Sequence, residues 1–91
     1  MSSAVRAALE RLIEQAKGDA GQSRRVAYFL LAWWNAGQCG GFDLTNLWSV
    51  DAAIAADMTM VFGFLTRCKA YPDRFGYEDD FEAIMRQWRP D

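Results

Sequence analysis

The sequence of 91 residues contains no histidine, which removes the usual general base of nucleophilic catalysis. It has only two cysteines, Cys39 and Cys68, which are far apart and belong to no CxxC pair. A structural zinc site needs about four ligands, usually Cys and His. We therefore expect no enzyme activity, no metal and no cofactor, and we expect both cysteines to be free thiols in a reducing compartment.

A long apolar run is also absent. The longest one covers residues 26–34, whereas a helix needs roughly 20 apolar residues to cross a bilayer. No apolar stretch near the N-terminus resembles a signal peptide. We therefore expect a cytoplasmic protein that has no membrane partner.

A strongly basic segment is missing as well, and the net charge is −2. Residues 1–42 contain five Lys or Arg and three Asp or Glu, whereas residues 43–91 contain five and nine. A nucleic-acid binder normally shows a basic patch, and the largest here is Arg24-Arg25. Nucleic acid is therefore not an expected partner. The acidic second half is either a solvated face or a surface for a basic partner.

The chain has only two prolines, and no segment alternates apolar and polar residues with a period of two. Apolar residues instead recur at spacings of three and four, which is typical of amphipathic helices. The pattern predicts helices over residues 3–17, 24–36, 50–71 and 78–89, and a short helical turn over residues 43–48. The predicted fold is all-α, in which residues 1–91 form a single compact four-helix domain with one extra short helical turn.

The linker GDAGQ, residues 18–22, suits a turn between antiparallel helices, and it would also allow the first helix to be loosely attached. Ser23 is predicted to cap the second helix and Asp43 the short turn, because their side-chain oxygens can accept backbone N–H groups. Gly37 is expected to stop the second helix, and Pro90 to close the last one.

The segment 50–71 is expected to organise the core through one apolar face at helical spacing. That face consists of Ile54, Met58, Val61, Phe62, Leu65 and Cys68. Asp57 is expected on the outer face of the same helix. The short helical turn is expected to point three apolar side chains inward, namely Leu44, Leu47 and Trp48.

The predicted helix over residues 24–36 is apolar almost all round. A helix of this kind is either central in the core or has a second apolar face covered by a partner. A chain of 91 residues cannot easily bury so many large rings, and Trp and Tyr are enriched at binding hot spots. Core packing alone and packing plus an interface both remain open, and the expected interface residues are Tyr28, Trp33 and Trp34.

The acidic run Glu78, Asp79 and Asp80 begins the last predicted helix. Three carboxylates in a first turn complement the positive end of the helix dipole. The same run is the expected acidic part of the interface, where it would face a basic partner.

Residues 24–90 contain the runs GGFDLTNLWSVD, DMTMVFGFL and YPDRFGYEDDFEAIMRQWRP. In this part the chain resembles small uncharacterised proteins encoded on bacterial mobile elements, such as integrative elements and plasmids. The resemblance implies cargo or an accessory gene of mobile DNA. The resemblance implies no activity and no catalytic or ligand-binding residue. It does not extend to the first predicted helix.

We interpret the chain as a non-catalytic protein–protein interaction module, acting as a homodimer or as an adaptor or inhibitor of a larger bacterial component. One alternative is a DNA-associated regulator with a helix-turn-helix-like arrangement. Its contacts would come from Arg24, Arg25, Arg67 and Lys69. Another alternative is a small-molecule-binding helical domain, with a pocket between the second and long helices roofed by Trp33 or Trp48.

Overall fold

The computed structural model describes residues 1–89 and contains four α-helices, two 3₁₀-helices and, within those residues, no strand. The α-helices are α1 (Ser3–Ala16), α2 (Gly21–Cys39), α3 (Ala52–Leu65) and α4 (Glu78–Trp88). The 3₁₀-helices are η1 (Leu44–Ser49) and η2 (Pro72–Phe75). The predicted all-α fold with a short helical turn, η1, is confirmed. Over the same residues, no helix combines the length and the apolar character that a membrane crossing requires.

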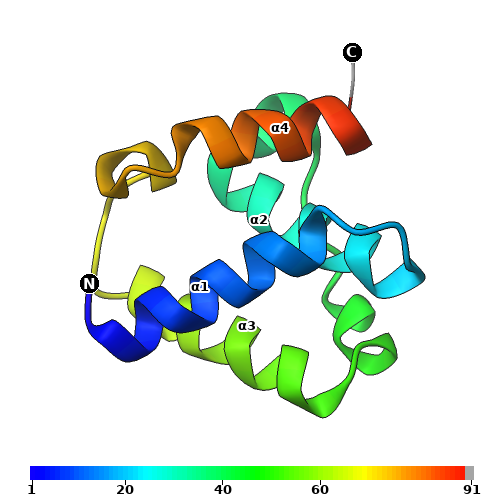
Figure 1. Cartoon of the computed structure of the whole chain (residues 1–91), viewed down its shortest axis with the longest axis horizontal. Helices are drawn as coiled ribbons and strands as arrows, with labels where there is room; N and C mark the ends of the chain where they lie inside the picture. Colours follow the sequence, from blue (N-terminus) through cyan, green and yellow to red (C-terminus); the bar gives the residue numbers. More distant parts are fainter. Residues whose placement is uncertain (90–91) are drawn as a thin grey trace.

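α1 lies at the centre of the fold and packs against the three other α-helices, with α3 and α4 on opposite sides of it (Figure 1). Its inward stripe recurs at spacings of three and four, which places it on one face. The stripe is buried and consists of Val5, Ala8, Leu9, Leu12, Ile13 and Ala16. Although the linker at residues 18–22 was expected to allow loose attachment, α1 is the helix on which the core is built.

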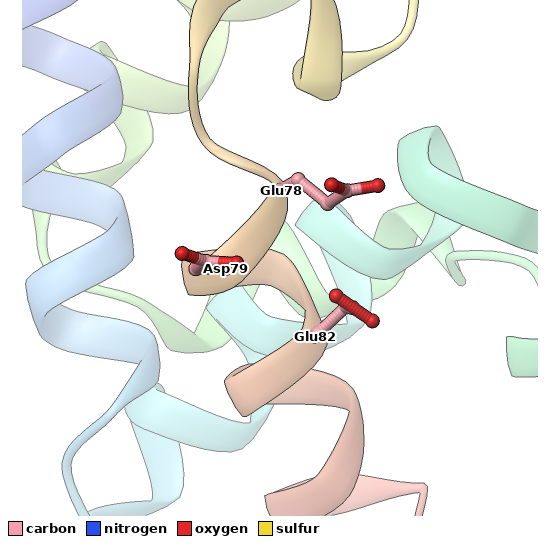
Figure 2. Close-up of side chains that lie close together, drawn as sticks. All are labelled: Glu78, Asp79 and Glu82. Atoms are coloured by element: carbon pink, nitrogen blue, oxygen red, sulfur yellow. The ribbon is translucent and has the colours of Figure 1, made fainter.

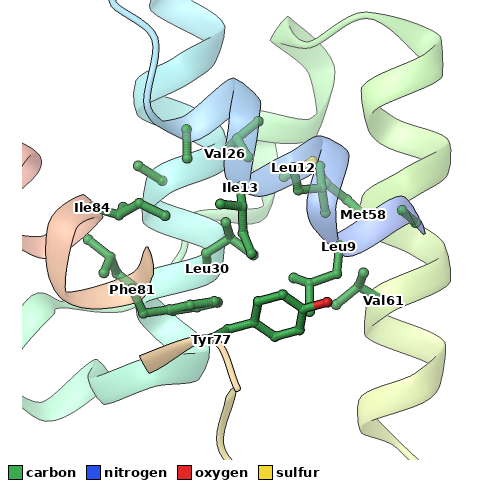
Figure 3. Close-up of a cluster of buried hydrophobic side chains, with 14 of the residues drawn as sticks. Leu9, Leu12, Ile13, Val26, Leu30, Met58, Val61, Tyr77, Phe81 and Ile84 are labelled. Atoms are coloured by element: carbon green, nitrogen blue, oxygen red, sulfur yellow. The ribbon is translucent and has the colours of Figure 1, made fainter. Parts of the chain in front are cut away.

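The core gathers apolar side chains from all four α-helices (Figure 3). Its fully buried members outside α1 include Val26, Leu30, Met58, Val61, Phe81 and Ile84. Each such side chain contributes about 1.5–3 kcal/mol when it leaves water. The segment 50–71 was expected to organise the core, but only Met58 and Val61 of α3 are buried.

Side-chain oxygens fix the starts of two helical segments. Asp43 caps η1 as predicted, since its carboxylate accepts the Thr45 N–H at 2.9 Å. Ser23 is not the N-cap of α2, which begins earlier, at Gly21. The Ser23 hydroxyl instead accepts the Ala20 N–H at 3.2 Å from inside the first turn. The Ser23 side chain therefore stabilises the first turn of α2 without being its N-cap residue.

α2 is interrupted near its C-terminal end and continues past Gly37, so the prediction that this glycine stops it is wrong. Asn35 has an extended backbone, and its side-chain oxygen accepts the Gln38 N–H at 3.2 Å. Asn35 therefore acts as an internal cap for one more helical turn. That turn ends at Gly40, whose φ of +91° favours glycine.

α3 ends at Leu65, so the prediction that this helix continues to residue 71 is wrong. The segment after it is fixed by Trp33, whose indole Nε1 donates to the Ala70 carbonyl oxygen at 2.9 Å. This bond ties the segment that follows α3 to α2. Pro90, predicted to close the last helix, lies outside the described residues.

Tyr77 joins the start of α4 to α1. Its hydroxyl donates to Glu10 Oε2 at 2.8 Å and accepts from Arg6 Nη1 at 2.8 Å. The Arg6 guanidinium also lies 5.5 Å from the centre of the buried ring. Burial, together with the hydrogen bond to Glu10, raises the pKa of the Tyr77 hydroxyl above its usual value of 10.0.

The substitution Tyr77→Phe should lower the free energy of unfolding by about 1–2 kcal/mol at neutral pH, because it removes two hydrogen bonds to charged groups. The raised pKa means that Tyr77 stabilises the fold fully below pH 10.0, and that this contribution is lost as the pH rises through the folded-state pKa. Urea denaturation at neutral and alkaline pH measures both effects. The alkaline loss of stability should be smaller in Tyr77→Phe than in the unmodified chain.

The matched control for this prediction is Tyr71→Phe, since Tyr71 is 63% exposed. It should leave both the neutral stability and its alkaline decline unchanged. A Tyr77→Phe protein as stable as the unmodified chain at every pH would contradict the role assigned to Tyr77.

Candidate functional site

The aromatic side chains of α2 that the sequence places in an interface are half-buried and are used in packing within the chain. The Trp33 ring meets Phe81 of α4 edge to face, with centroids 5.7 Å apart, and its N–H is bonded to Ala70. The Tyr28 ring lies 4.0 Å from the Arg89 guanidinium carbon. Much of the aromatic surface expected to be surplus on α2 therefore contacts the segments around α4.

Trp34 borders a surface depression of about 400 Å³ between α2, the middle of α4 and the segment around η2. The other lining residues are Asn35, Gln38, Tyr71, Asp73, Glu82 and Met85. Two aromatic rings and two carboxylates thus share one hollow. This combination is suited to a cationic side chain, which can contact a ring face and pair with a carboxylate.

The structure separates the acidic run at the start of α4. Asp80 forms an ion pair with Lys17, next to the C-terminal end of α1. Glu78 and Asp79 instead form a cluster with Glu82, and the carboxylate oxygens lie within 4.8 Å of one another (Figure 2). Sequence reasoning missed Glu82, although residues three and four positions apart share a helix face. The cluster could offer oxygen ligands to a hard cation, which would need several further ligands from water.

The large exposed apolar side chains gather mainly on η1 and α3. The prediction that the short turn points its apolar residues inward is wrong, because Leu44, Leu47 and Trp48 are 67%, 37% and 84% exposed. Phe62 was expected on the inner face of its helix but is 58% exposed. Neighbouring residues of a helix point about 100° apart, so Phe62 faces water although Val61 beside it is buried.

A groove of about 290 Å³ lies where η1 meets α2 and α3. It is lined by Phe29, Phe42, Leu44, Leu47, Met58, Thr59 and Phe62. Two of its rings, Phe29 and Phe42, meet edge to face with centroids 5.4 Å apart. The one polar lining side chain is Thr59, whose hydroxyl donates to the Ala55 carbonyl oxygen at 2.8 Å. The walls of the groove are therefore almost wholly apolar.

The outer side of α3 carries no charged residue. The one charged residue of this helix, Asp57, was expected on the outer face, but it is turned to α1 and accepts two hydrogen bonds from Arg11 at 2.9 and 2.8 Å. We call the groove and its exposed surroundings the α3–η1 face. Its exposed side chains are Leu44, Leu47, Trp48, Thr59 and Phe62.

The remaining candidates are spread over the molecule. Arg24 and Arg25 lie in the first turns of α2, whereas Arg67 and Lys69 follow α3. Figure 1 shows that α2 begins and α3 ends at opposite ends of α1, so the four cations do not form one basic patch. Both cysteines are free thiols, as predicted. Trp33, one of the two expected pocket roofs, borders a depression of about 340 Å³ with residues 65 and 68–71, which belong to the segment predicted as the long helix.

The comparisons with known proteins give one match. The model of a family described as "Family of unknown function (DUF7673)" matches residues 6–89. Neither the curated proteins nor the solved structures contain a match. The match begins within α1, so the family's domain includes most of the helix that lies outside the resemblance to mobile-element proteins. The chain belongs to this family of unknown function, DUF7673.

Proposed function

We propose that this chain is a non-catalytic protein–protein interaction module that binds its partner through the α3–η1 face. The observation that carries the proposal is the apolar groove of about 290 Å³, bordered by exposed apolar side chains from η1 and α3. Large apolar side chains in water are unfavourable, and contiguous apolar patches on soluble proteins commonly mark interaction sites. Grooves of this kind take the apolar side of a partner.

The size of the exposed apolar area supports this proposal. Trp48, Phe62, Leu44 and Leu47 together leave roughly 400 Å² in water, taking about 150–250 Å² for an aromatic side chain and about 100 Å² for Leu. The largest apolar patch on a typical monomer covers about 300–600 Å² and is often functional. The α3–η1 face therefore has the apolar area of an interaction surface.

The groove suits a protein better than a small molecule. Ligand pockets usually span about 300–1,000 Å³ and contain a few polar groups that orient the ligand. This groove of about 290 Å³ offers only the Thr59 hydroxyl for that purpose. It contains no titratable side chain and no cation for a phosphate, so the DNA-regulator alternative receives no support from this face.

A second contact, with a basic partner, is supported by the depression beside Trp34. Glu82, which lines this depression, also belongs to the cluster with Glu78 and Asp79. Within the described residues, none of these three carboxylates forms an ion pair. Of the interface residues expected from the sequence, Trp34, Glu78 and Asp79 suit this contact. The others, Tyr28, Trp33 and Asp80, hold the fold around it through Arg89, Ala70 and Lys17.

The resemblance over residues 24–90 supports a biological setting for the module. It favours cargo of a bacterial mobile element, acting as an adaptor or inhibitor of a larger component or as a homodimer. The two free thiols are compatible with a reducing compartment such as the cytoplasm.

A photo-crosslinking amino acid placed at Leu47 or Phe62 should give an adduct of higher mass in cells that make the protein. The same amino acid at Ala7, an exposed position on α1, should give much less. Electrophoresis followed by mass spectrometry measures the adducts. If neither position on the α3–η1 face gives an adduct while the helical content is unchanged, this face is not the contact surface.

The second contact predicts binding of a short oligo-arginine peptide, measured by calorimetry at low salt. The double substitution Glu78→Gln/Glu82→Gln should weaken this binding by about fivefold or more, since each exposed ion pair contributes up to about 1 kcal/mol. The matched control Glu14→Gln/Asp19→Asn removes the same charge from exposed positions elsewhere and should have little effect. Equal weakening by both variants would show only a general effect of charge.

A further inference from the structure

We infer that the occupant of the α3–η1 face is a second copy of this chain, paired about a two-fold axis with Trp48 of each copy in the groove of the other. This inference rests on the proposed function, because it names the partner of the same face. It is carried by the shape, the chemistry, the area and the charge of that face.

The segment η1 offers both a projecting ring and part of the wall of the groove. Trp48 is 84% exposed and directly follows Leu47, a lining residue of the groove, so a projecting ring and a hollow belong to the same short segment. In a two-fold interface both copies use the same patch, so a patch that binds a second copy of itself must contain both a projecting side chain and a hollow that receives it. η1 carries both.

The chemistry of the groove matches an indole ring. Its walls offer the rings of Phe29, Phe42 and Phe62 and the thioether of Met58, which are favourable neighbours for an aromatic side chain. A buried indole N–H also needs an acceptor. The Thr59 hydroxyl can provide one, because it donates its own hydrogen to Ala55 and keeps its lone pairs free.

The apolar area agrees with what a stable pair needs. A standard interface buries about 800 Å² on each partner, of which about 56–65% is apolar. The four large side chains of the α3–η1 face supply roughly 400 Å² of apolar surface, which is most of that requirement.

The charge distribution favours a second copy over a charged partner. In a two-fold pair, a charged residue on the patch would lie near the same residue, or near the same patch, of the other copy, so like charges on the patch would repel. Residues 44–49 and the outer side of α3 carry no charge. At the edge of the patch, Asp43 is exposed, and hydrogen bonds from the Thr45 N–H and hydroxyl lower the pKa of its carboxyl.

Sedimentation equilibrium over a concentration series tests the inference. The unmodified chain should approach twice its monomer mass of 10.3 kDa as the concentration rises. Trp48→Ala should weaken the pairing by at least about 30-fold, the effect of one hot-spot residue. The control Tyr71→Ala removes another exposed aromatic ring, outside the α3–η1 face, and should pair like the unmodified chain. Circular dichroism checks that each variant keeps its helices.

A mixing experiment tests the position of Trp48 in the groove. Thr59→Phe fills the groove but leaves Trp48 in place, so this variant alone should also pair poorly. In an equal mixture, the intact Trp48 of Thr59→Phe can enter the open groove of Trp48→Ala. One of the two contacts is then restored, and the mixture should form more pairs than either variant alone. A mixture that pairs no better than its components would overturn the proposed geometry.

The inference and the proposed function can fail separately. An unmodified chain that stays monomeric to about 1 mM overturns the second copy as the occupant, because an interface of this size should pair well below that concentration. If crosslinkers at Leu47 or Phe62 then attach to a different protein, the proposed function stands with another partner. If they attach to nothing, both are wrong.

Discussion

The burial of the apolar stripe of α1 is the interaction on which the rest of the structure depends. The six side chains of this stripe are buried, and α1 packs against α2, α3 and α4. α3 in turn has α1 as its main helical neighbour. A helix whose residues are apolar almost all round, but which is covered on one side, leaves its other side in water. The α3–η1 face is therefore a consequence of how the core is built.

Polar contacts hold this arrangement and leave the α3–η1 face free. On one side of α1, Tyr77 and the indole of Trp88 tie α4 to α1, the latter through a 2.8 Å bond to the Ala16 carbonyl oxygen. On the other side, α3 is fixed by the pair Arg11–Asp57 and by two bonds between Gln22 and Asp51 at its start. These partners use the polar groups of α3 that face inward. The outer side of α3 keeps apolar side chains in contact with water, and contiguous apolar surface of this kind commonly marks an interaction site.

Helical periodicity was enough to predict the fold class, the approximate helices and the cap at Asp43, because these depend on local spacing and local hydrogen bonds. It could not predict which helix is central, since several amphipathic helices compete for the same partners. Leu44, Leu47 and Trp48 were assigned to the interior because they are apolar, but a short 3₁₀ turn has no second layer to cover it. We expected the exposed apolar surface on α2, but the tryptophan rings of this helix pack against α4. The near absence of charge between Asp51 and Arg67 was the available signal for the α3–η1 face.

The central claim is that the exposed face left by the α1-centred core is covered by a second copy. Backbone hydrogen exchange of the unmodified chain, followed at low and at high protein concentration, tests it most directly. The account predicts slower exchange at high concentration in η1 and in the neighbouring part of α3, with α4 unchanged. Equal exchange of η1 at both concentrations, or new protection confined to α4, would contradict it.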